Sequence, residues 1–212
     1  MLLCETEGPD AADARLPRLG RWRLAPGGPI EADIPGDATH AFVVADGRAN
    51  PVDQVEAFKA WTAARAVEVA RVICVVDCRL AERNRGLFAW YEACIHFSDV
   101  VLLNHREGVP NKWMGDFRRE FEGRFYPCLF EHVKGGRVGN PALVLNPVAL
   151  RISHVFDEEE WAGEDDPGEG DEGDEDEQGL EPEVDPYFER RSGGRRVREI
   201  PDIRKFLPGA GA

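Results

Sequence analysis

The sequence has little that would send the chain into a membrane or out of the cell. It contains no run of about 18 uncharged apolar residues, so no transmembrane helix is expected. The opening stretch MLLCETEGPD has no basic residue and soon turns acidic, unlike a secretory signal. Five cysteines are an odd number in a chain long enough to fold without disulfides. Reduced thiols in a cytoplasmic protein are the simplest interpretation.

Basic residues are absent from one long segment. Residues 157–185 contain 17 Asp or Glu and no Lys or Arg, which accounts for the net charge of -14. Low hydrophobicity and repulsion between like charges predict a disordered acidic linker there. Residues 186–212 hold seven Arg or Lys against three acids, and residues 1–156 are close to neutral. We therefore expect an α/β domain at 1–156, the acidic linker, and a basic C-terminal tail at 186–212.

The charged segments restrict the kinds of partner. The acidic segment could bind a basic protein partner through its charge, whereas its carboxylates would repel the phosphates of a nucleic acid. The basic tail also carries apolar side chains that could anchor it on the α/β domain, namely Tyr187, Phe188, Ile200, Ile203 and Phe206.

From residue 41 onward, apolar strands alternate with amphipathic helices. Buried strands are expected at 41–45, 72–77, 100–104 and 126–130, with helices from Pro51, over 82–97 and around 113–121. Asn50 is placed to cap the helix that begins at Pro51. The first 40 residues have no clear period apart from a possible short strand at 2–5. This alternation predicts an α/β fold, a mostly parallel sheet flanked by helices.

Polar side chains follow three of the predicted strands. Asp46 follows the first, Asp77 ends the second, and the third runs into the segment from Asn104 to Glu107. In an open α/β sheet the ligand crevice lies beyond the carboxyl ends of the strands, so a site is expected there. The alternative is that these residues form ordinary polar loops, because strand ends are polar in any such fold.

Taken in order, these strand ends resemble those of the CobW-like GTPases, P-loop metallochaperones related to the HypB and UreG groups. HAFVVADGRANPVDQV resembles the family's Walker B and switch region through Gly47, Ala49 and Pro51. RVICVVDCR resembles the next strand through Asp77, and SDVVLLNHRE resembles the strand and guanine motif through Asn104. The resemblance covers roughly residues 40–135.

The resemblance implies a P-loop NTPase-like sheet with GTP and Mg²⁺ as ligands. Asn104 and Glu107 would contact the guanine base, and Gly47 and Asp46 would lie at the nucleotide. Asp46 and Asp77 would be the candidate metal ligands.

Several parts of the family pattern are missing. No G-x-x-x-x-G-K-[ST] occurs, so the sequence lacks the backbone amides, lysine and hydroxyl that hold phosphates and magnesium. Val44 stands in place of the Walker B Glu, His105 replaces the guanine-motif Lys, and Glu107 replaces its Asp. The Cys-x-Cys-Cys metal motif is also absent. Phosphoryl transfer without a phosphate cradle loses most of its electrostatic stabilisation, so we do not expect GTP hydrolysis by this chain.

Three functions remain open. The chain is a degenerate CobW-like domain (a pseudoGTPase) that binds a nucleotide or a protein weakly, a fragment of an active GTPase metallochaperone without its P-loop, or an α/β scaffold whose acidic segment binds a basic protein. The altered Walker B and guanine motifs favour the first.

The sequence also offers a pair of cysteines, Cys74 and Cys78, near the end of one predicted strand. We interpret Cys74 as a core thiol and Cys78 as a loop thiol, in preference to two ligands of a shared metal.

Overall fold

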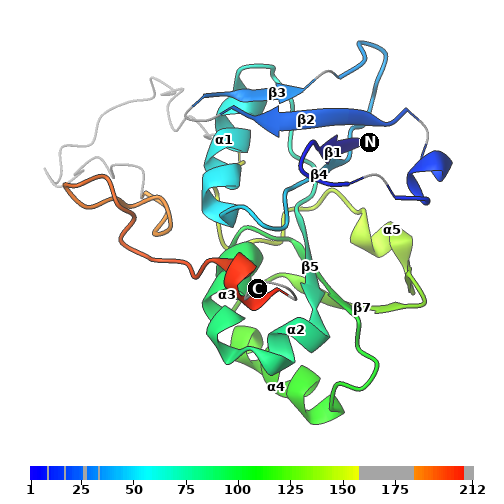
Figure 1. Cartoon of the computed structure of the whole chain (residues 1–212), viewed down its shortest axis with the longest axis vertical. Helices are drawn as coiled ribbons and strands as arrows, with labels where there is room; N and C mark the ends of the chain where they lie inside the picture. Colours follow the sequence, from blue (N-terminus) through cyan, green and yellow to red (C-terminus); the bar gives the residue numbers. More distant parts are fainter. Residues whose placement is uncertain (9, 17, 26–27, 33, 158–183, 208–212) are drawn as a thin grey trace, which may run out of the picture.

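The computed structural model describes residues 1–8, 10–16, 18–25, 28–32, 34–157 and 184–207. These residues form an α/β protein with two sheets of four strands each, which lie in separate halves of the molecule (Figure 1). The α/β class is therefore confirmed, but two mixed sheets stand where we expected one mostly parallel sheet. Most of the acidic linker, residues 158–183, lies outside the described residues. None of the helices in the described part of the chain is long and apolar enough to span a membrane.

The first sheet has the strand order β3-β2-β1-β4. Its strands are β1 (Leu2–Cys4), β2 (Gly20–Leu24), β3 (Ile30–Ala32) and β4 (Val43–Val44). Strand β1 runs parallel to β2 and β4, and β3 is antiparallel to β2. The expected strand at 2–5 is confirmed over Leu2–Cys4.

The expected buried strand at 41–45 is wrong in both length and burial. Only Val43 and Val44 form β4, at the edge of the sheet. The side chains of Phe42 and Val44 are 51% and 39% exposed. A continuous apolar run indicates burial only when the strand has neighbours on both sides and cover on both faces, and among the described strands β4 pairs with β1 alone.

Helix α1 (Pro51–Ala63) begins where the sequence predicts. The Asn50 side-chain oxygen accepts a hydrogen bond from the backbone N–H of Val52 at 2.9 Å, which satisfies a donor that the helix itself leaves free. Trp61 and Phe58 on this helix pack with Trp22 of β2 in the core of the first half.

The second sheet has the order β5-β6-β7-β8. Strands β5 (Ile73–Asp77), β6 (Val100–Asn104) and β7 (Leu129–Lys134) are parallel, and β8 (Arg137–Val138) is antiparallel to β7. The predictions at 72–77 and 100–104 are confirmed. The strand expected at 126–130 begins only at Leu129, after Pro127, which has no N–H to donate to a neighbouring strand.

The predicted helix over 82–97 is divided. Helix α2 (Cys78–Arg83) ends at Asn84, whose φ of -127° is not helical, and a 3₁₀ turn, η2 (Arg85–Leu87), leads into α3 (Phe88–His96). Helix α4 (Asn111–Glu122) confirms the third predicted helix, and α5 (Pro141–Val144) is one short turn.

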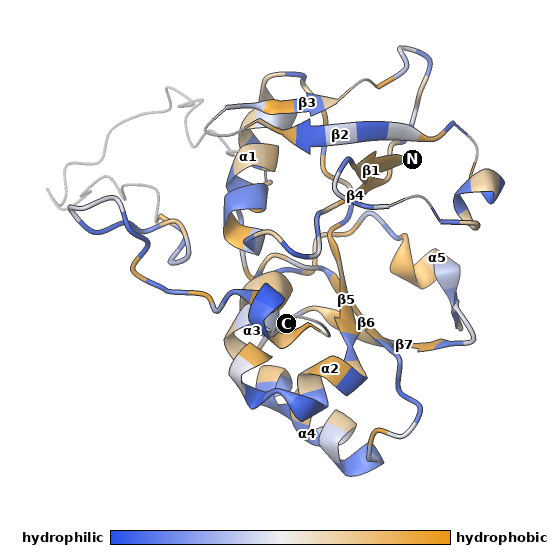
Figure 2. Cartoon of the chain, viewed as in Figure 1, coloured by the Kyte–Doolittle hydropathy of each residue, from blue (hydrophilic) through white to orange (hydrophobic). Residues whose placement is uncertain are grey.

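One face of the second sheet is covered by these helices. Val76, Val101 and Leu103 pack against the aromatic side chains of Tyr91 and Phe121. Figure 2 shows that β5 and β6 are hydrophobic along most of their length, whereas α4 combines polar and apolar residues. Helix α1 packs on α3 and so connects the two halves.

Residues 184–207 contact the body at both ends of an exposed loop, 189–195, that projects beside α1, and they end in a 3₁₀ turn, η3 (Ile203–Phe206) (Figure 1). Tyr187 and Ile203 are buried, and Phe188, Ile200 and Phe206 pack on the two cores beside them. The Arg196 guanidinium binds the carboxylates of Asp53 and Glu56 on α1, each at 2.6 Å. The predicted anchoring of the tail through its apolar residues is confirmed.

Candidate functional site

The carboxyl ends of β5 and β6 bring three polar residues together, namely Asp77, Asn104 and His105. Asp77 and Asn104 are paired across the two strands. One oxygen of the Asp77 carboxylate lies 2.8 Å from His105 Nδ1, and the other accepts the backbone N–H of Leu80 at 3.0 Å and so caps α2. Burial alone would raise the pKa of Asp77, but the hydrogen bonds from His105 and Leu80 together lower it. Asp77 is therefore held as a carboxylate at the base of this site.

Glu107, the predicted guanine contact, already has a partner. Its carboxylate accepts a hydrogen bond from Arg79 Nη2 at 3.1 Å, and its backbone carbonyl accepts one from Arg79 Nε at 2.9 Å. The Glu107 side chain is 70% exposed, so this ion pair is screened by water and contributes about 0–1 kcal/mol. His105 has a φ of 49°, in the left-handed region, which turns the loop back toward α2. The loop after β6 is thus attached to α2 at two points.

The other two candidates, Asp46 and Gly47, follow β4 in the first half. The buried Gln54 side chain accepts the Asp46 N–H at 2.8 Å and donates to the Asp46 carbonyl at 2.9 Å. The Asp46 carboxylate accepts the backbone N–H of Arg48 at 2.8 Å, as in a polar turn. Gly47 has open space where a Cβ would lie, so nothing in this conformation requires glycine.

Asp46 and Asp77 therefore belong to different sheets. Within the described residues, no group of three or more His, Cys, Asp or Glu side chains is arranged as a metal site. A shared metal at Asp46 and Asp77 stays a prediction.

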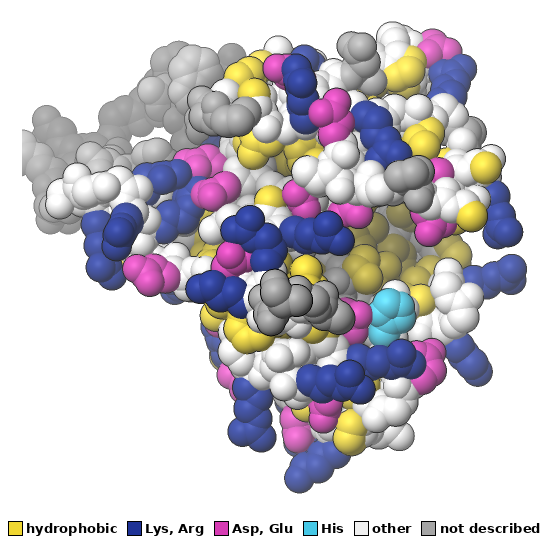
Figure 3. All heavy atoms as spheres, in the orientation of Figure 1, with side chains coloured by type: hydrophobic (Ala, Val, Ile, Leu, Met, Phe, Trp, Pro, Cys, Tyr) yellow, Lys and Arg dark blue, Asp and Glu magenta, His cyan; other side chains and the backbone are white. Residues whose placement is uncertain are grey.

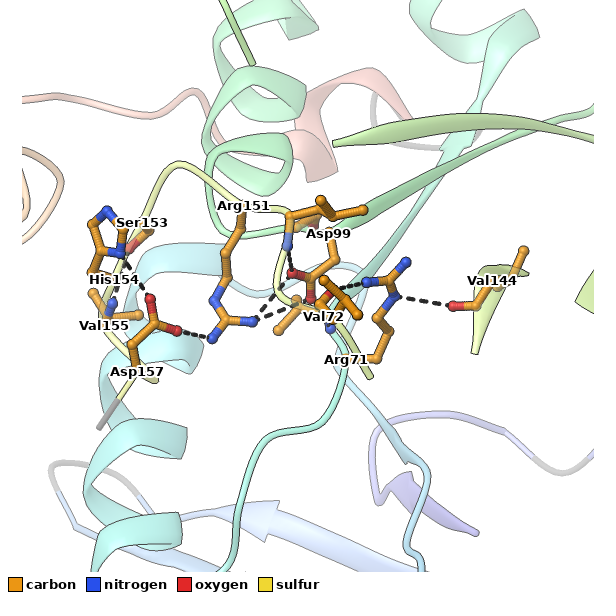
Figure 4. Close-up of polar contacts among 12 residues, drawn as sticks. Arg71, Val72, Asp99, Val144, Arg151, Ser153, His154, Val155 and Asp157 are labelled. Atoms are coloured by element: carbon orange, nitrogen blue, oxygen red, sulfur yellow. Dashed lines mark hydrogen bonds and ion pairs between the residues drawn. The ribbon is translucent and has the colours of Figure 1, made fainter. Parts of the chain in front are cut away.

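A second polar cluster, which the sequence reasoning missed, lies at the opposite end of the same strands (Figure 4). Asp99, directly before β6, is fully buried and accepts backbone N–H groups of Val72 and Leu150, each at 2.7 Å. It also accepts the Arg151 guanidinium at 3.2 Å. Because its oxygens are occupied by these donors, the carboxylate joins the chain segments around the sheet and offers no room for a ligand. Its only signal in the sequence is an acid directly before an apolar strand.

The Arg151 guanidinium in turn binds Asp157, which ends the described part of the body. Nearby, Arg71 donates to the backbone carbonyls of Val144, at 3.2 Å, and Val148. These contacts hold the segment after α5 against the amino end of β5 (Figure 4).

A third cluster contains the residue types of a hydrolase triad, His96, Ser153 and Asp185. His96 Nε2 and Ser153 Oγ lie 2.8 Å and 2.5 Å from the same Asp185 oxygen. A nucleophilic serine must give its proton to the histidine, whereas here the serine donates to the aspartate. All three side chains are buried, so the cluster fixes the chain where it returns after the acidic segment.

No protein-family model, curated protein or solved structure matches this chain.

All five cysteines are free. Cys74 is buried as predicted, but the interpretation of Cys78 as a loop thiol is wrong, because it is the first residue of α2 and fully buried. Burial and the neighbouring Asp77 charge raise the pKa of Cys78 to about 11. The thiol is therefore protonated at neutral pH and is a weak nucleophile.

Proposed function

We propose that the chain is a degenerate nucleotide-binding domain, similar to the CobW-like GTPases, that binds a purine base weakly at the carboxyl ends of β5 and β6 and does not hydrolyse GTP. The observation that carries the proposal is the pairing of Asp77 with Asn104 at adjacent ends of two parallel strands. Ligands of open α/β sheets bind beyond such ends.

The contacts of the loop decide how strong the binding can be. The amide of Asn104 would bind the edge of the base, and Glu107 would accept the N–H groups of guanine. Glu107 must first leave Arg79, which costs about 0–1 kcal/mol because the pair is exposed. Its side chain is also one methylene longer than the expected Asp, and paired hydrogen bonds tolerate such a shift poorly. Both effects weaken a preference for guanine.

The residues present fit Mg²⁺ poorly. The Asp46 carboxylate is engaged by the Arg48 N–H, and Mg²⁺ sites of this kind depend on substrate phosphates as co-ligands. The chain has no P-loop to hold those phosphates. The proposed binding therefore involves the base, and no catalytic step is assigned.

The test is a titration of the purified chain with fluorescently labelled GTP and ATP in the absence of Mg²⁺. We expect weak binding with a guanine preference that Asn104→Ala abolishes and that Asn146→Ala, an exposed Asn remote from the loop, leaves unchanged. Arg79→Ala frees Glu107 and should tighten GTP binding by up to about fivefold, since an exposed pair contributes at most about 1 kcal/mol.

A guanine preference that survives Asn104→Ala would show that the site is misplaced. Absence of binding to either nucleotide, together with salt-sensitive capture of a basic protein such as a histone, would favour the scaffold with an acidic segment. Tight binding with hydrolysis after a P-loop segment is supplied would favour the fragment of an active GTPase.

A further inference from the structure

The connections of the second sheet place its crossover helices on one face. The chain passes from β5 through α2 and α3 to β6, and from β6 through α4 to β7, so both steps move in the same direction across the sheet. Because strand–helix–strand connections are right-handed, two steps in the same direction put their helices on the same side. The core agrees with this rule, since Tyr91 of α3 and Phe117 of α4 both pack with Val76 of β5.

The strand register shows which side chains lie on the opposite face. Successive side chains of a strand point to opposite faces. Val75 therefore points away from the helices, because Cys74 and Val76 on either side of it belong to the core beneath them. The pairing of the strands extends this face from β5 across β6 and β7 to β8. We call it the open face, and its residues are Val75, Leu102, Glu131, Val133 and Val138.

The open face is apolar but exposed. Val75 is 57% exposed, whereas Val76 beside it is 0% exposed. The other four residues of the open face are partly buried. Only the row nearest the amino ends is closed, since Val100 is 0% exposed. Parallel sheets are normally covered on both faces, so the open face is the part of this fold that a further element would cover.

The helix side of the sheet, in contrast, presents a polar surface. Figure 3 shows side chains of both charges interspersed over α2 and α4. On α4, Arg118 pairs with Glu122 and Arg119 with Asp116, all of them exposed. The helices thus already turn a solvated side outward, which the open face lacks.

Glu131 places a negative charge in the middle of the open face, between the apolar Leu102 and Val133. This charge disfavours the acidic residues 158–183 as the covering element. It also disfavours a second copy of the chain, because a two-fold contact through this face would bring two Glu131 carboxylates together. The last five residues, 208–212, are PGAGA and offer no large apolar side chain. A partner with a basic residue amid apolar ones is complementary.

We propose that the open face binds an amphipathic helix of another protein, with apolar side chains at i, i+3 and i+7 and Lys or Arg at i+4. Helices are the elements that cover parallel sheets, and these positions form one stripe along a helix. The apolar residues would cover Val75 and Leu102, and the basic residue would pair with Glu131. A strand of five residues, such as β5, extends about 16 Å. A helix of about eleven residues has the same length.

The probe is a fluorescein-labelled peptide of about 18 residues, long enough to form a helix in water. It has Leu at i, i+3, i+7 and i+11, Lys at i+4 and mainly Ala and Gln elsewhere. One control peptide has Glu in place of Lys, and a second has the same composition with the leucines spread around the helix. Binding is measured by fluorescence anisotropy on the full chain. We expect the Lys peptide to bind about fivefold more tightly than the Glu peptide and at least tenfold more tightly than the scrambled one.

Two pairs of protein variants locate the site. Glu131→Lys should invert the preference between the Lys and Glu peptides, whereas Glu120→Lys, the same change on exposed α4, should leave it unchanged. Val75→Glu should weaken binding of the Lys peptide by about tenfold, because the helix would bury the new charge. Phe125→Glu, at a side chain 90% exposed beyond the end of α4, should have no effect. Circular dichroism and the thermal midpoint would check that each variant folds.

Four results would overturn the proposal. Failure of the Lys peptide to bind, or equal binding of the scrambled peptide, would exclude a docked amphipathic helix. An unchanged peptide preference in Glu131→Lys would exclude this face. A dimer that forms without peptide and is lost in Val75→Glu would show that a second copy of the chain covers the face. None of these measurements uses a nucleotide, so the outcome is separate from that of the proposed nucleotide site.

Discussion

Replacing Asp99 by Asn tests the polar cluster at the amino end of the second sheet. The fully buried carboxylate binds Arg151 and two backbone N–H groups, from Val72 and Leu150. Asn has the same shape and keeps one acceptor oxygen, but it removes the charge and places an amide donor where a second acceptor is needed. The Arg151 side chain, only 3% exposed, then keeps Asp157 as its remaining carboxylate partner.

The expected loss in the free energy of unfolding follows from the burial of Asp99 and Arg151. Breaking a buried ion pair by removing one partner costs about 3–5 kcal/mol, and a buried N–H without an acceptor costs about 1–3 kcal/mol. These terms overlap, because Asp157 keeps part of the Arg151 charge compensated, so we expect a total of about 3–4 kcal/mol. With a urea dependence of about 2 kcal/mol per molar, the unfolding midpoint should fall by about 1.5–2 M.

The assay is urea unfolding followed by tryptophan fluorescence. Asp53→Asn is the matched control, since that carboxylate also binds an arginine but is 55% exposed, and it should cost less than about 1 kcal/mol. The double variant Asp99→Asn with Arg151→Met removes the unpaired cation and should recover part of the loss. Equal midpoint shifts for Asp99→Asn and Asp53→Asn, or a double variant less stable than the sum of its single changes, would refute the reasoning.

Two further predictions concern the ends of chain segments. Burial alone would raise the pKa of Asp185, but hydrogen bonds from His96, Ser153 and the Tyr187 amide hold it below the ordinary value of 3.8. The stabilisation that the Asp185 carboxylate provides is therefore present above about pH 4 and is lost as the pH falls through the lower pKa of the folded state. The variant Asp185→Asn should make the free energy of unfolding less dependent on pH in this range. Urea unfolding between pH 5 and pH 3 would measure the difference. Asn50→Ala removes the cap of α1 and should lower the free energy of unfolding by about 1 kcal/mol in the same assay, whereas Asn50→Asp should keep most of the stability. Equal losses in both variants would contradict the capping role.

The elements that the sequence predicts well are those whose pattern is local. Strands β5 and β6 are short uninterrupted apolar runs, and α1 has both its cap and a proline at its first position. Strand β2 was missed because its sequence, GRWRL, places arginines around one buried tryptophan in a region rich in proline and glycine. The burial of β4 was overestimated because an apolar run carries no information about how many neighbours a strand finds.

The candidate site is likewise predictable only in part from the sequence. The strand ends at Asp77 and Asn104 can be located from the sequence, because parallel strands in register bring their ends together. Their partners cannot: Arg79 and Glu107 are separated by 28 residues, and His96 and Asp185 by 89. Gln54, which fixes the backbone of Asp46, looks in the sequence like any polar residue on a helix.

The buried thiols of the second sheet make it possible to measure how often that sheet becomes exposed to solvent. Burial raises the pKa of Cys128 to about 12, and a hydrogen bond with Cys94 together with burial raises that of Cys74. Alkylating reagents attack the thiolate, so these cysteines and Cys78 are protected while the sheet stays covered. Each transient separation of α2 or α3 from β5 would expose Cys74 and Cys78. The rate at which they are alkylated in the folded protein therefore measures how often this half of the molecule opens, at single-residue resolution and without an engineered cysteine.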